Sequence, residues 1–235
     1  MPKFRVDESI LNVFPDVVLG IIIARNINNS GERSEIITAL RQEEAKTVER
    51  FAGFSINEHP QILPWREAYR KFGAKPKDYP SSVENLIKRV SKGYSLPHIN
   101  LLVDIYNAIS LRHIVPVGGE DLDKIEGDIE LVFASDHEAA IRLLGEPEDR
   151  APKPGEVIYK DNVGAICRRW NWKEADRTKF TEATKNAVIV IEGLPPVFRI
   201  QIENILKELS ALIAEYCGGN ISTVILDKNQ HQHEF

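Results

Sequence analysis

The amino-acid sequence predicts an α+β fold, and three observations support this prediction. Segments with the 3.6-residue period of amphipathic helices are mixed with short runs rich in Val and Ile, which are typical of buried strands. The two kinds of segment do not alternate regularly, so a parallel βαβ sheet is not expected. The length of 235 residues suits one large domain.

The first part of the chain predicts one buried strand followed by two helices. Residues 17–27 are rich in Val and Ile and should form the strand. Apolar residues recur at helical spacing over 32–51 and again over 62–72. Gly73 then ends the second helix.

Two further helices are expected before residue 118. Ser81 and Glu84 form an S-x-x-E capping box, in which each side chain binds a free backbone N–H of the other residue, and this box starts a helix. Pro97 should mark the start of the next helix, which carries Asn100.

After Gly118-Gly119 the apolar pattern changes to that of strands, with one long helix near the end. The turn over residues 161–164 predicts a hairpin. The expected elements are strands over 129–134, 156–160, 165–170 and 187–191, a helix over 200–216 and a strand over 221–226.

Composition excludes several classes of protein. The chain is 43% hydrophobic and 28% charged, which is ordinary for a globular protein. Its longest apolar run, residues 17–24, is too short to cross a bilayer, and acidic residues precede it, unlike in a secretory signal. Cys167 and Cys217 form no CxxC pair and are expected as reduced thiols in the core. We expect a cytoplasmic protein without a cofactor, a bound metal or a membrane partner.

The net charge of −5 gives no overall attraction to nucleic acid, but basic residues are clustered. Residues 66–92 hold eight bases and three acids, a local balance of +5, and residues 168–179 hold five bases and two acids, a balance of +3. Such clusters can neutralise phosphates. A solvated helix face is an equally good explanation.

Small polar residues follow one face of the helix that begins near residue 98. Asn100, Asp104 and Asn107 are three or four positions apart and so lie side by side. They lead into the predicted Gly118-Gly119 loop, whose N–H groups could contact a carboxylate or a carbonyl. Capping of the helix and a simple tight turn are the competing explanations. Standard nucleotide, zinc-protease and hydrolase motifs are absent from the sequence.

Several motifs occur in an order that is similar to a known family. They are WREAYRKFG, PSSVENLIKRV, LPHINLLVDIYNAISL, VPVGGEDLDKIEGDIEL, GEVIYKD and CRRWNWKEADRTKFTEATKNAVIVIEG. Over residues 61–193 the chain resembles the editing domain of the bacterial phenylalanyl-tRNA synthetase beta subunit, the B-three/B-four domain, in its free-standing form. The resemblance implies a β-sandwich of unusual topology with packed helices. It also implies a strand-helix extension over 1–60 packed on the main domain, an editing-like domain over 61–226 and a polar tail over 227–235.

The resemblance and the residue patterns together give three groups of candidate site residues. The catalytic group is Asp104, Asn107, Gly118, Gly119 and Asp121. The substrate-binding group is Asn100, Trp170, Thr184, Asn186 and Glu192. The tRNA-binding group is Arg70, Lys71, Lys88, Arg89, Arg168 and Arg169. Core packing competes for Trp170, and a turn-stabilising role competes for Thr184 and Asn186. The chain departs from the family at Gly118, where the synthetase has a histidine, and at Pro97, where it has an arginine.

The resemblance implies two functions of different classes. One is a stand-alone editing module that hydrolyses the ester of mischarged aminoacyl-tRNA in trans, with the tRNA acceptor end carrying an amino acid as its partner. The other is a non-catalytic module that binds tRNA or a free amino acid with the same residues. A complete tRNA ligase is not expected, because the rest of the chain is too short for a synthetase core.

Overall fold

The structure is a computed structural model that describes residues 2–235. Its helices are α1 (Glu8–Val13), α2 (Ser34–Phe51), α3 (Leu63–Lys71), α4 (Ser82–Ser91), α5 (Leu101–His113) and α6 (Arg199–Cys217). Its strands are β1 (Lys3–Val6), β2 (Val18–Arg25), β3 (Val117–Asp121), β4 (Ile129–Phe133), β5 (Ile141–Arg142), β6 (Asp149–Arg150), β7 (Val157–Lys160), β8 (Ala165–Arg168), β9 (Lys173–Glu174), β10 (Asn186–Gly193), β11 (Asn220–Leu226) and β12 (Gln232–Glu234).

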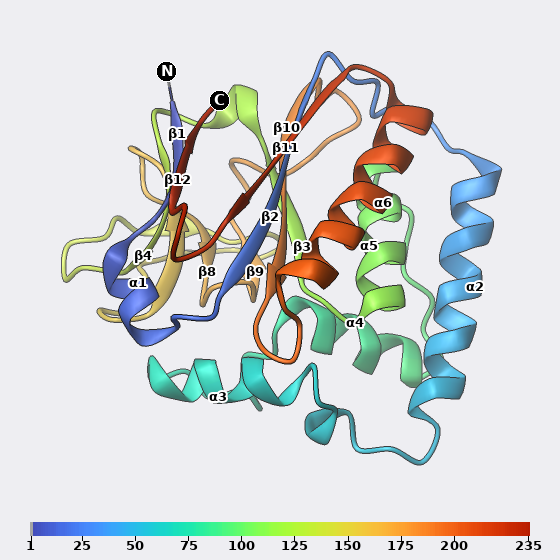
Figure 1. The fold of residues 1–235 in the computed structure, drawn as a ribbon, viewed down its shortest axis with the longest axis horizontal. Helices are drawn as coiled ribbons and strands as arrows, with labels where there is room; N and C mark the ends of the chain where they lie inside the picture. The colour runs from blue at the N-terminus through green and yellow to red at the C-terminus, as the bar shows by residue number, and fades with distance from the viewer. Residues whose placement is uncertain (1) are drawn as a thin grey trace.

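Two β-sheets pack face to face at the centre of the molecule (Figure 1). One has the strand order β12-β1-β4-β7-β8-β9 and the other the order β11-β2-β10-β3. Neighbouring strands run antiparallel, apart from the parallel pair of β1 and β4. In the second sheet every pair of neighbours is distant in sequence. The predicted α+β class, with a β-sandwich of unusual topology and packed helices, is confirmed.

The inner strands of the four-stranded sheet, β2 and β10, are buried on both faces. Helices α5 and α6 cover one face, and α2 lies outside them, on the right in Figure 1. Successive residues of β10 therefore enter different cores: Ile189 and Ile191 pack against the helices, whereas Val188 and Val190 pack between the sheets. Burial on both faces explains why β2 is continuously apolar instead of alternating.

The sequence signals located the starts of α4 and α5, but the contacts at each start differ in part from those expected. Ser81 Oγ accepts the Glu84 N–H at 3.4 Å and starts α4, as expected. The reciprocal half of the capping box is replaced by ion pairs, since the buried Glu84 carboxylate contacts Arg66 and Lys88, each at 2.5 Å. Helix α5 begins after Asn100, not at Pro97, because the Asn100 side chain accepts the Val103 N–H at 3.1 Å.

Both ends of the chain belong to the sheets. Strand β2 lies between β10 and β11, inside the four-stranded sheet, and β1 pairs with β4. The polar tail, residues 227–235, forms β12, which pairs with β1, so the two termini lie side by side (Figure 1). Within residues 2–235 no helix has both the length and the hydropathy needed to cross a bilayer.

Two local predictions were wrong. Gly118 and Gly119 do not form a loop; they lie inside β3, opposite Val190 and Ile189 of β10. Trp170 is not on an extended segment, because φ is +48° at Arg169 and +66° at Trp170, and the chain turns sharply after β8. The strand expected over 165–170 therefore ends at Arg168.

Candidate functional site

A cavity of about 200 Å³ lies between the two sheets. Its floor comes from β3 and β10, and its other walls come from the six-stranded sheet and the turn after β8. The lining is largely apolar and aromatic but includes three glutamates. The lining residues are Phe4, Ser82, Val117, Gly118, Gly119, Glu120, Ile129, Leu144, Tyr159, Ile166, Cys167, Trp170, Asn171, Trp172, Lys173, Glu174, Val188, Val190 and Glu192.

The two neighbouring glycines face opposite sides of β3. A Cβ at Gly118 would meet Glu174 Oε1 at 3.0 Å, on the cavity side. A Cβ at Gly119 would meet the Val188 carbonyl oxygen at 2.4 Å and the Phe180 ring at 2.8 Å, on the helical side. Gly118 thus opens the cavity, whereas Gly119 lets β3 approach β10.

The Gly119 N–H is the backbone donor that faces the site. It points to Glu174 Oε1 at 3.4 Å, away from β10. N–H groups alternate in direction along a strand, so the N–H of Gly118 points toward β10. One glycine of the pair, not both, can therefore offer a hydrogen bond to a ligand.

Glu192 is the most enclosed carboxylate of the cavity, with 3% of its surface exposed. The Tyr159 hydroxyl donates to its Oε1 at 2.5 Å, and the Asn171 amide donates to its Oε2. Burial raises the pKa of Glu192 to about 7, and the hydrogen bonds from Tyr159 and Asn171 oppose that rise. All of these donors are neutral, so the charge of Glu192 has no cationic partner.

Glu174 and Glu120 form a second acidic group beside the glycines. Burial raises the pKa of Glu174 to about 7, against a smaller lowering by the Gly119 N–H. Burial, followed by repulsion from Glu174, raises the pKa of Glu120 well above its usual value. Glu120 Oε2 is buried without a hydrogen-bond partner. Titratable groups near neutrality in an enclosed cavity are typical of binding and catalytic sites.

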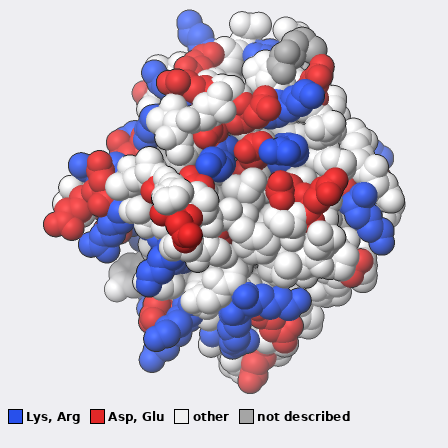
Figure 2. Space-filling view, turned by 90° about the vertical axis from the view of Figure 1, so that its left-hand side faces the viewer, with Lys and Arg blue, Asp and Glu red and all other residues white. Residues whose placement is uncertain are grey.

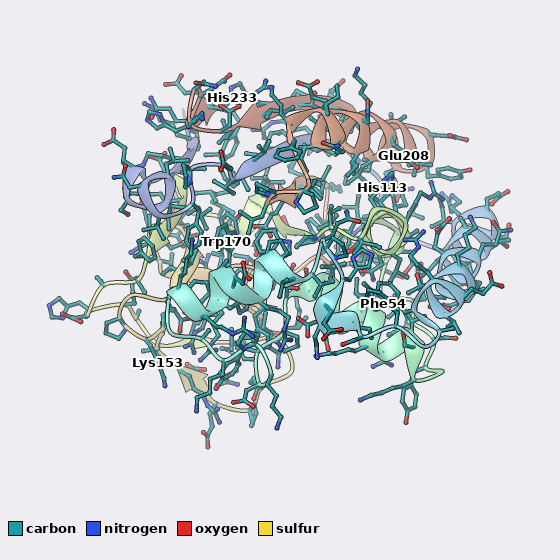
Figure 3. The ribbon with its side chains drawn as sticks, turned by 60° about the horizontal axis from the view of Figure 1, so that its bottom comes forward. Phe54, His113, Lys153, Trp170, Glu208 and His233 are labelled. Atoms are coloured by element: carbon teal, nitrogen blue, oxygen red, sulfur yellow. The ribbon has the colours of Figure 1, made fainter. Side chains whose placement is uncertain are left out.

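Aromatic side chains close the cavity at the turn after β8. Trp170 is fully buried between Phe14 and Trp65, with ring centroids 4.8 and 5.2 Å away. Figure 3 shows it in the middle of the molecule, next to α3. The Arg169 guanidinium stacks on Trp172, 4.6 Å from the ring centroid. Trp170 therefore packs in the core and also lines the cavity.

The sulfur of Cys167 is not a nucleophile here. Burial and three nearby carboxylates raise the pKa of the Cys167 thiol well above its usual value, so it stays protonated. Within residues 2–235, no three His, Cys, Asp or Glu side chains are grouped so that they could hold a metal ion.

The predicted polar ladder on α5 does not reach the cavity. Asn100 caps its own helix and Asp104 Oδ2 contacts His98 Nδ1 at 2.5 Å, while Asn107 is buried in α5. None of the three lines the cavity. Asp104 and Asn107 therefore do not line the cavity with Gly118, although all three were expected in one catalytic group.

Asp121, Thr184 and Asn186 lie together, but at the far end of β10. Thr184 Oγ1 donates to Asp121 Oδ2 at 2.7 Å, and Asn186 donates to Asp123 Oδ1 at 2.8 Å. Asp121 also accepts the Asp123 N–H at 3.0 Å. These bonds fix the turn after β3, and none of the three predicted residues lines the cavity.

The predicted tRNA-binding residues divide into buried and exposed groups. Arg168 is 3% exposed and makes two hydrogen bonds to Glu156, at 2.7 and 2.8 Å; Arg169 is 6% exposed. Neither presents an exposed cation to phosphate, because each is bound inside the fold. Lys88 is half-buried and paired with Glu84. The exposed bases of this set are Arg70, Lys71 and Arg89.

The surface does not carry one large basic patch on the face shown in Figure 2. There Lys and Arg side chains are interspersed with Asp and Glu. Basic side chains do occur in its lower part, at the end of the molecule where α3 lies in Figure 1. Any phosphate contact on this face would involve a few basic residues.

Sequence reasoning named four of the lining residues and missed the others. Gly118, Gly119, Trp170 and Glu192 line the cavity as candidates from the sequence. The acidic group of Glu120 and Glu174, and the donors Tyr159 and Asn171, were not predicted. For Glu192 the sequence pattern supports the prediction, because Glu192 continues the alternation of Val188 and Val190 on β10 and places a charge on an otherwise apolar face.

The fold is a β-sandwich domain with packed helices, and a cavity that carries three glutamates lies between its sheets. The B3/4 domain model matches residues 64–218 of the chain, and the chain belongs to that family.

Parts of this chain are similar in sequence to known proteins. It is 26% identical, over 165 residues, to the phenylalanine–tRNA ligase beta subunit of Fusobacterium nucleatum subsp. nucleatum, covering 60% of the chain and 20% of that protein. It is 28% identical, over 113 residues, to the 23S rRNA (uracil(1939)-C(5))-methyltransferase RlmD of Pseudomonas savastanoi pv. phaseolicola, covering 46% of the chain and 23% of the relative. The chain thus spans about a fifth of the length of these relatives.

A solved structure gives a more distant likeness. An N-terminal fragment of the phenylalanyl-tRNA synthetase beta subunit from Pyrococcus horikoshii aligns with a TM-score of 0.46 and 14% identity, over 94% of the chain and 53% of the fragment.

Proposed function

We propose that this protein is a stand-alone editing module that hydrolyses the ester of mischarged aminoacyl-tRNA in trans. The family and the synthetase relative support a tRNA-synthetase-like module. The observation that carries the hydrolytic proposal is the position of Glu174, which lies over Gly118 and accepts the Gly119 N–H inside the cavity. The cytoplasmic location expected from the sequence is part of this proposal.

An aminoacyl ester needs only modest activation of water and of its carbonyl group. The Gly119 hydrogen bond to Glu174 is long, at 3.4 Å, so a substrate carbonyl oxygen can replace the carboxylate on that N–H. The displaced carboxylate then lies beside the acyl carbon. A group with a pKa of about 7, as Glu174 has, is suited to act as a general base at neutral pH.

The reaction balances without a covalent intermediate. The Glu174 carboxylate takes a proton from water as the water oxygen bonds to the acyl carbon, and the Gly119 N–H stabilises the oxyanion. The ester C–O bond then breaks, and the proton passes from Glu174 to the ribose oxygen. The products are a free amino acid and uncharged tRNA. The catalytic roles expected for Asp104, Asn107 and Asp121 are not carried into this mechanism, because they line no part of the cavity.

A deacylation screen with the purified protein alone tests this proposal. The substrates are tRNAs charged with a broad panel of cognate, non-cognate and non-protein amino acids. Glu174→Gln should lower the rate on any substrate at least about 100-fold, as for loss of a general base. Glu148→Gln, at an exposed side chain, is the matched control and should leave the rate unchanged. Failure to deacylate any member of the panel would reject the proposal.

A non-catalytic module that binds tRNA or an amino acid is the second candidate. One observation favours it: the cavity holds no activated nucleophile, since the Cys167 thiol stays protonated and Gly118 stands where the synthetase has a histidine. Binding of uncharged and charged tRNA without any turnover in the screen would establish this alternative.

A further inference from the structure

The cavity is acidic at both ends of an apolar strip. Val188, Val190 and Glu192 line it from alternate positions of β10, and Glu120 lies opposite Val188 in the register. At about 3.3 Å per residue, the strip from Val188 to Glu192 is about 13 Å long. Glu120 therefore marks one end and Glu192 the other, and between them lie Gly118, opposite Val190, and the Glu174 carboxylate over Gly118.

The glutamates of this site, Glu120, Glu174 and Glu192, have no ion pair with a Lys or Arg side chain in the part of the chain that the structure describes. Lys173 is the basic residue of the lining, and it is bound to Glu146 at 2.5 Å. Arg177 lies near enough to lower the pKa of Glu120, but its guanidinium is bound to Asp161 at 2.8 Å. Without a cationic partner, burial favours the protonated form of these glutamates, and a cationic ligand would favour their ionised form by pairing with it.

The walls also suit an organic cation. Tyr159 and Trp170 lie beside Glu192, and aromatic faces attract ammonium and guanidinium groups. The low polarity of the lining strengthens an ion pair formed inside it. The volume of about 200 Å³ exceeds the roughly 150 Å³ of a cavity that holds benzene, so a long side chain fits.

We infer that the cavity selects an amino acid whose side chain ends in a cation, an ammonium or a guanidinium. Glu192 pairs with the side-chain cation, and Glu120 pairs with the α-ammonium group at the other end. This inference rests on the proposed function for the identity of the ligand as an acylated amino acid, but the binding step can be measured separately.

Amino acid amides imitate the acyl part of the substrate and are not turned over as esters. L-Lysinamide and L-argininamide are compared by calorimetry with neutral analogues of similar shape, L-norleucinamide and L-citrullinamide, and with L-tyrosinamide. At least one cationic amide should bind about tenfold or more tightly than its neutral analogue. Equal binding of each pair, tighter binding of L-tyrosinamide, or no binding of any amide would overturn the inference.

Substitutions of Glu192 and Glu120, at the two ends of the strip, distinguish the roles of these two carboxylates in binding. Glu192→Gln should abolish the preference for the cationic side chain and leave binding of the neutral amides within about twofold. Glu120→Gln should weaken all amides alike, because each carries the α-ammonium group. Glu148→Gln is the control with an exposed glutamate. A preference that survives Glu192→Gln in a folded variant would overturn the inference.

The outcome can be distinguished from that of the proposed function. Selective binding of a cationic amide with no deacylation of any tRNA would reject the hydrolytic proposal and leave the ligand class intact. Deacylation restricted to tRNAs that carry neutral amino acids would support the hydrolytic proposal and reject the ligand class. Deacylation of tRNAs charged with cationic amino acids would support both.

Discussion

The two glycines of β3 should respond in opposite ways to the same substitution. In Gly119→Ala the new Cβ meets the Val188 carbonyl oxygen at 2.4 Å and the Phe180 ring at 2.8 Å. The oxygen is part of the paired strand and cannot rotate away, so β3 and β10 must separate. Overpacking of this kind costs about 1–3 kcal/mol, and we expect the upper end, about 3 kcal/mol.

Gly118→Ala provides the matched comparison one residue away. Its Cβ meets Glu174 Oε1 at 3.0 Å, the far end of a side chain that can turn toward the cavity. Alanine also reduces the freedom of the unfolded chain, so the free energy of unfolding should stay within about 1 kcal/mol of the parent value.

Urea unfolding and thermal melting measure both variants. For a domain of this size, 3 kcal/mol corresponds to a melting temperature lower by about 6–12 °C for Gly119→Ala. A Gly119→Ala protein that is as stable as Gly118→Ala would refute the reasoning, because the two strands would then be farther apart than described. The same comparison shows why Gly118, not Gly119, is the position at which to alter the cavity without disturbing the fold.

Three further outcomes are expected. Arg168→Met removes the two hydrogen bonds from Arg168 to the buried Glu156 carboxylate and leaves Arg169, at 3.9 Å, as the nearest cation, which should cost about 3 kcal/mol in urea unfolding. Glu174 and Glu192 have pKa values of about 7 in the folded protein and 4.5 in the unfolded chain. Their contribution to the free energy of unfolding is therefore full below about pH 4.5 and is lost as the pH rises through 7. The double variant Glu174→Gln, Glu192→Gln should show a smaller fall in stability over this pH range. Binding of tRNA should weaken as salt rises, and charge reversal of three exposed bases should reduce both affinity and salt dependence: Arg70→Glu, Lys71→Glu and Arg89→Glu.

Each of these expectations has a contrary result. If Arg168→Met has the same free energy of unfolding as the parent protein, the bidentate pair with Glu156 does not contribute to stability. A pH profile of unfolding unchanged in the double variant would place the titration elsewhere. Filter binding of tRNA with unaltered affinity after the triple reversal would exclude the α3 and α4 surface as the contact.

The sequence predicted the elements well because most carry strong local signals. The apolar run of β2 and the Ser81 cap of α4 identified those elements, and the turn over 161–164 identified the β7–β8 hairpin. Short strands such as β1 and β12 have no such pattern and exist because each pairs with a segment distant in the chain. Gly118-Gly119 gave a turn signal that the pairing with β10 overrides.

The candidate site was harder to predict, for a physical reason. Polar residues on α5 satisfy caps and loop contacts, which are local tasks that look like ligand contacts in a sequence. The acidic group of the cavity comes from β3, β9 and β10, and only the sheet packing brings Glu120, Glu174 and Glu192 to one space. The exposure of basic side chains could not be predicted from the sequence either. Arg168 and Arg169 were expected on the surface, but each has a partner inside the fold.

The interior position of β2 has a consequence for how the chain is made. Its pairing partners, β10 and β11, begin at Asn186 and Asn220, so the first partner starts 161 residues after Arg25 (186 − 25 = 161). At roughly 5–20 residues per second, a ribosome needs about 8–32 s to add that length. During that time a continuous Val- and Ile-rich strand has neither neighbour and is a segment prone to pair with other chains. The nascent protein therefore depends on holding β2 unpaired until about the last fifth of its own chain emerges.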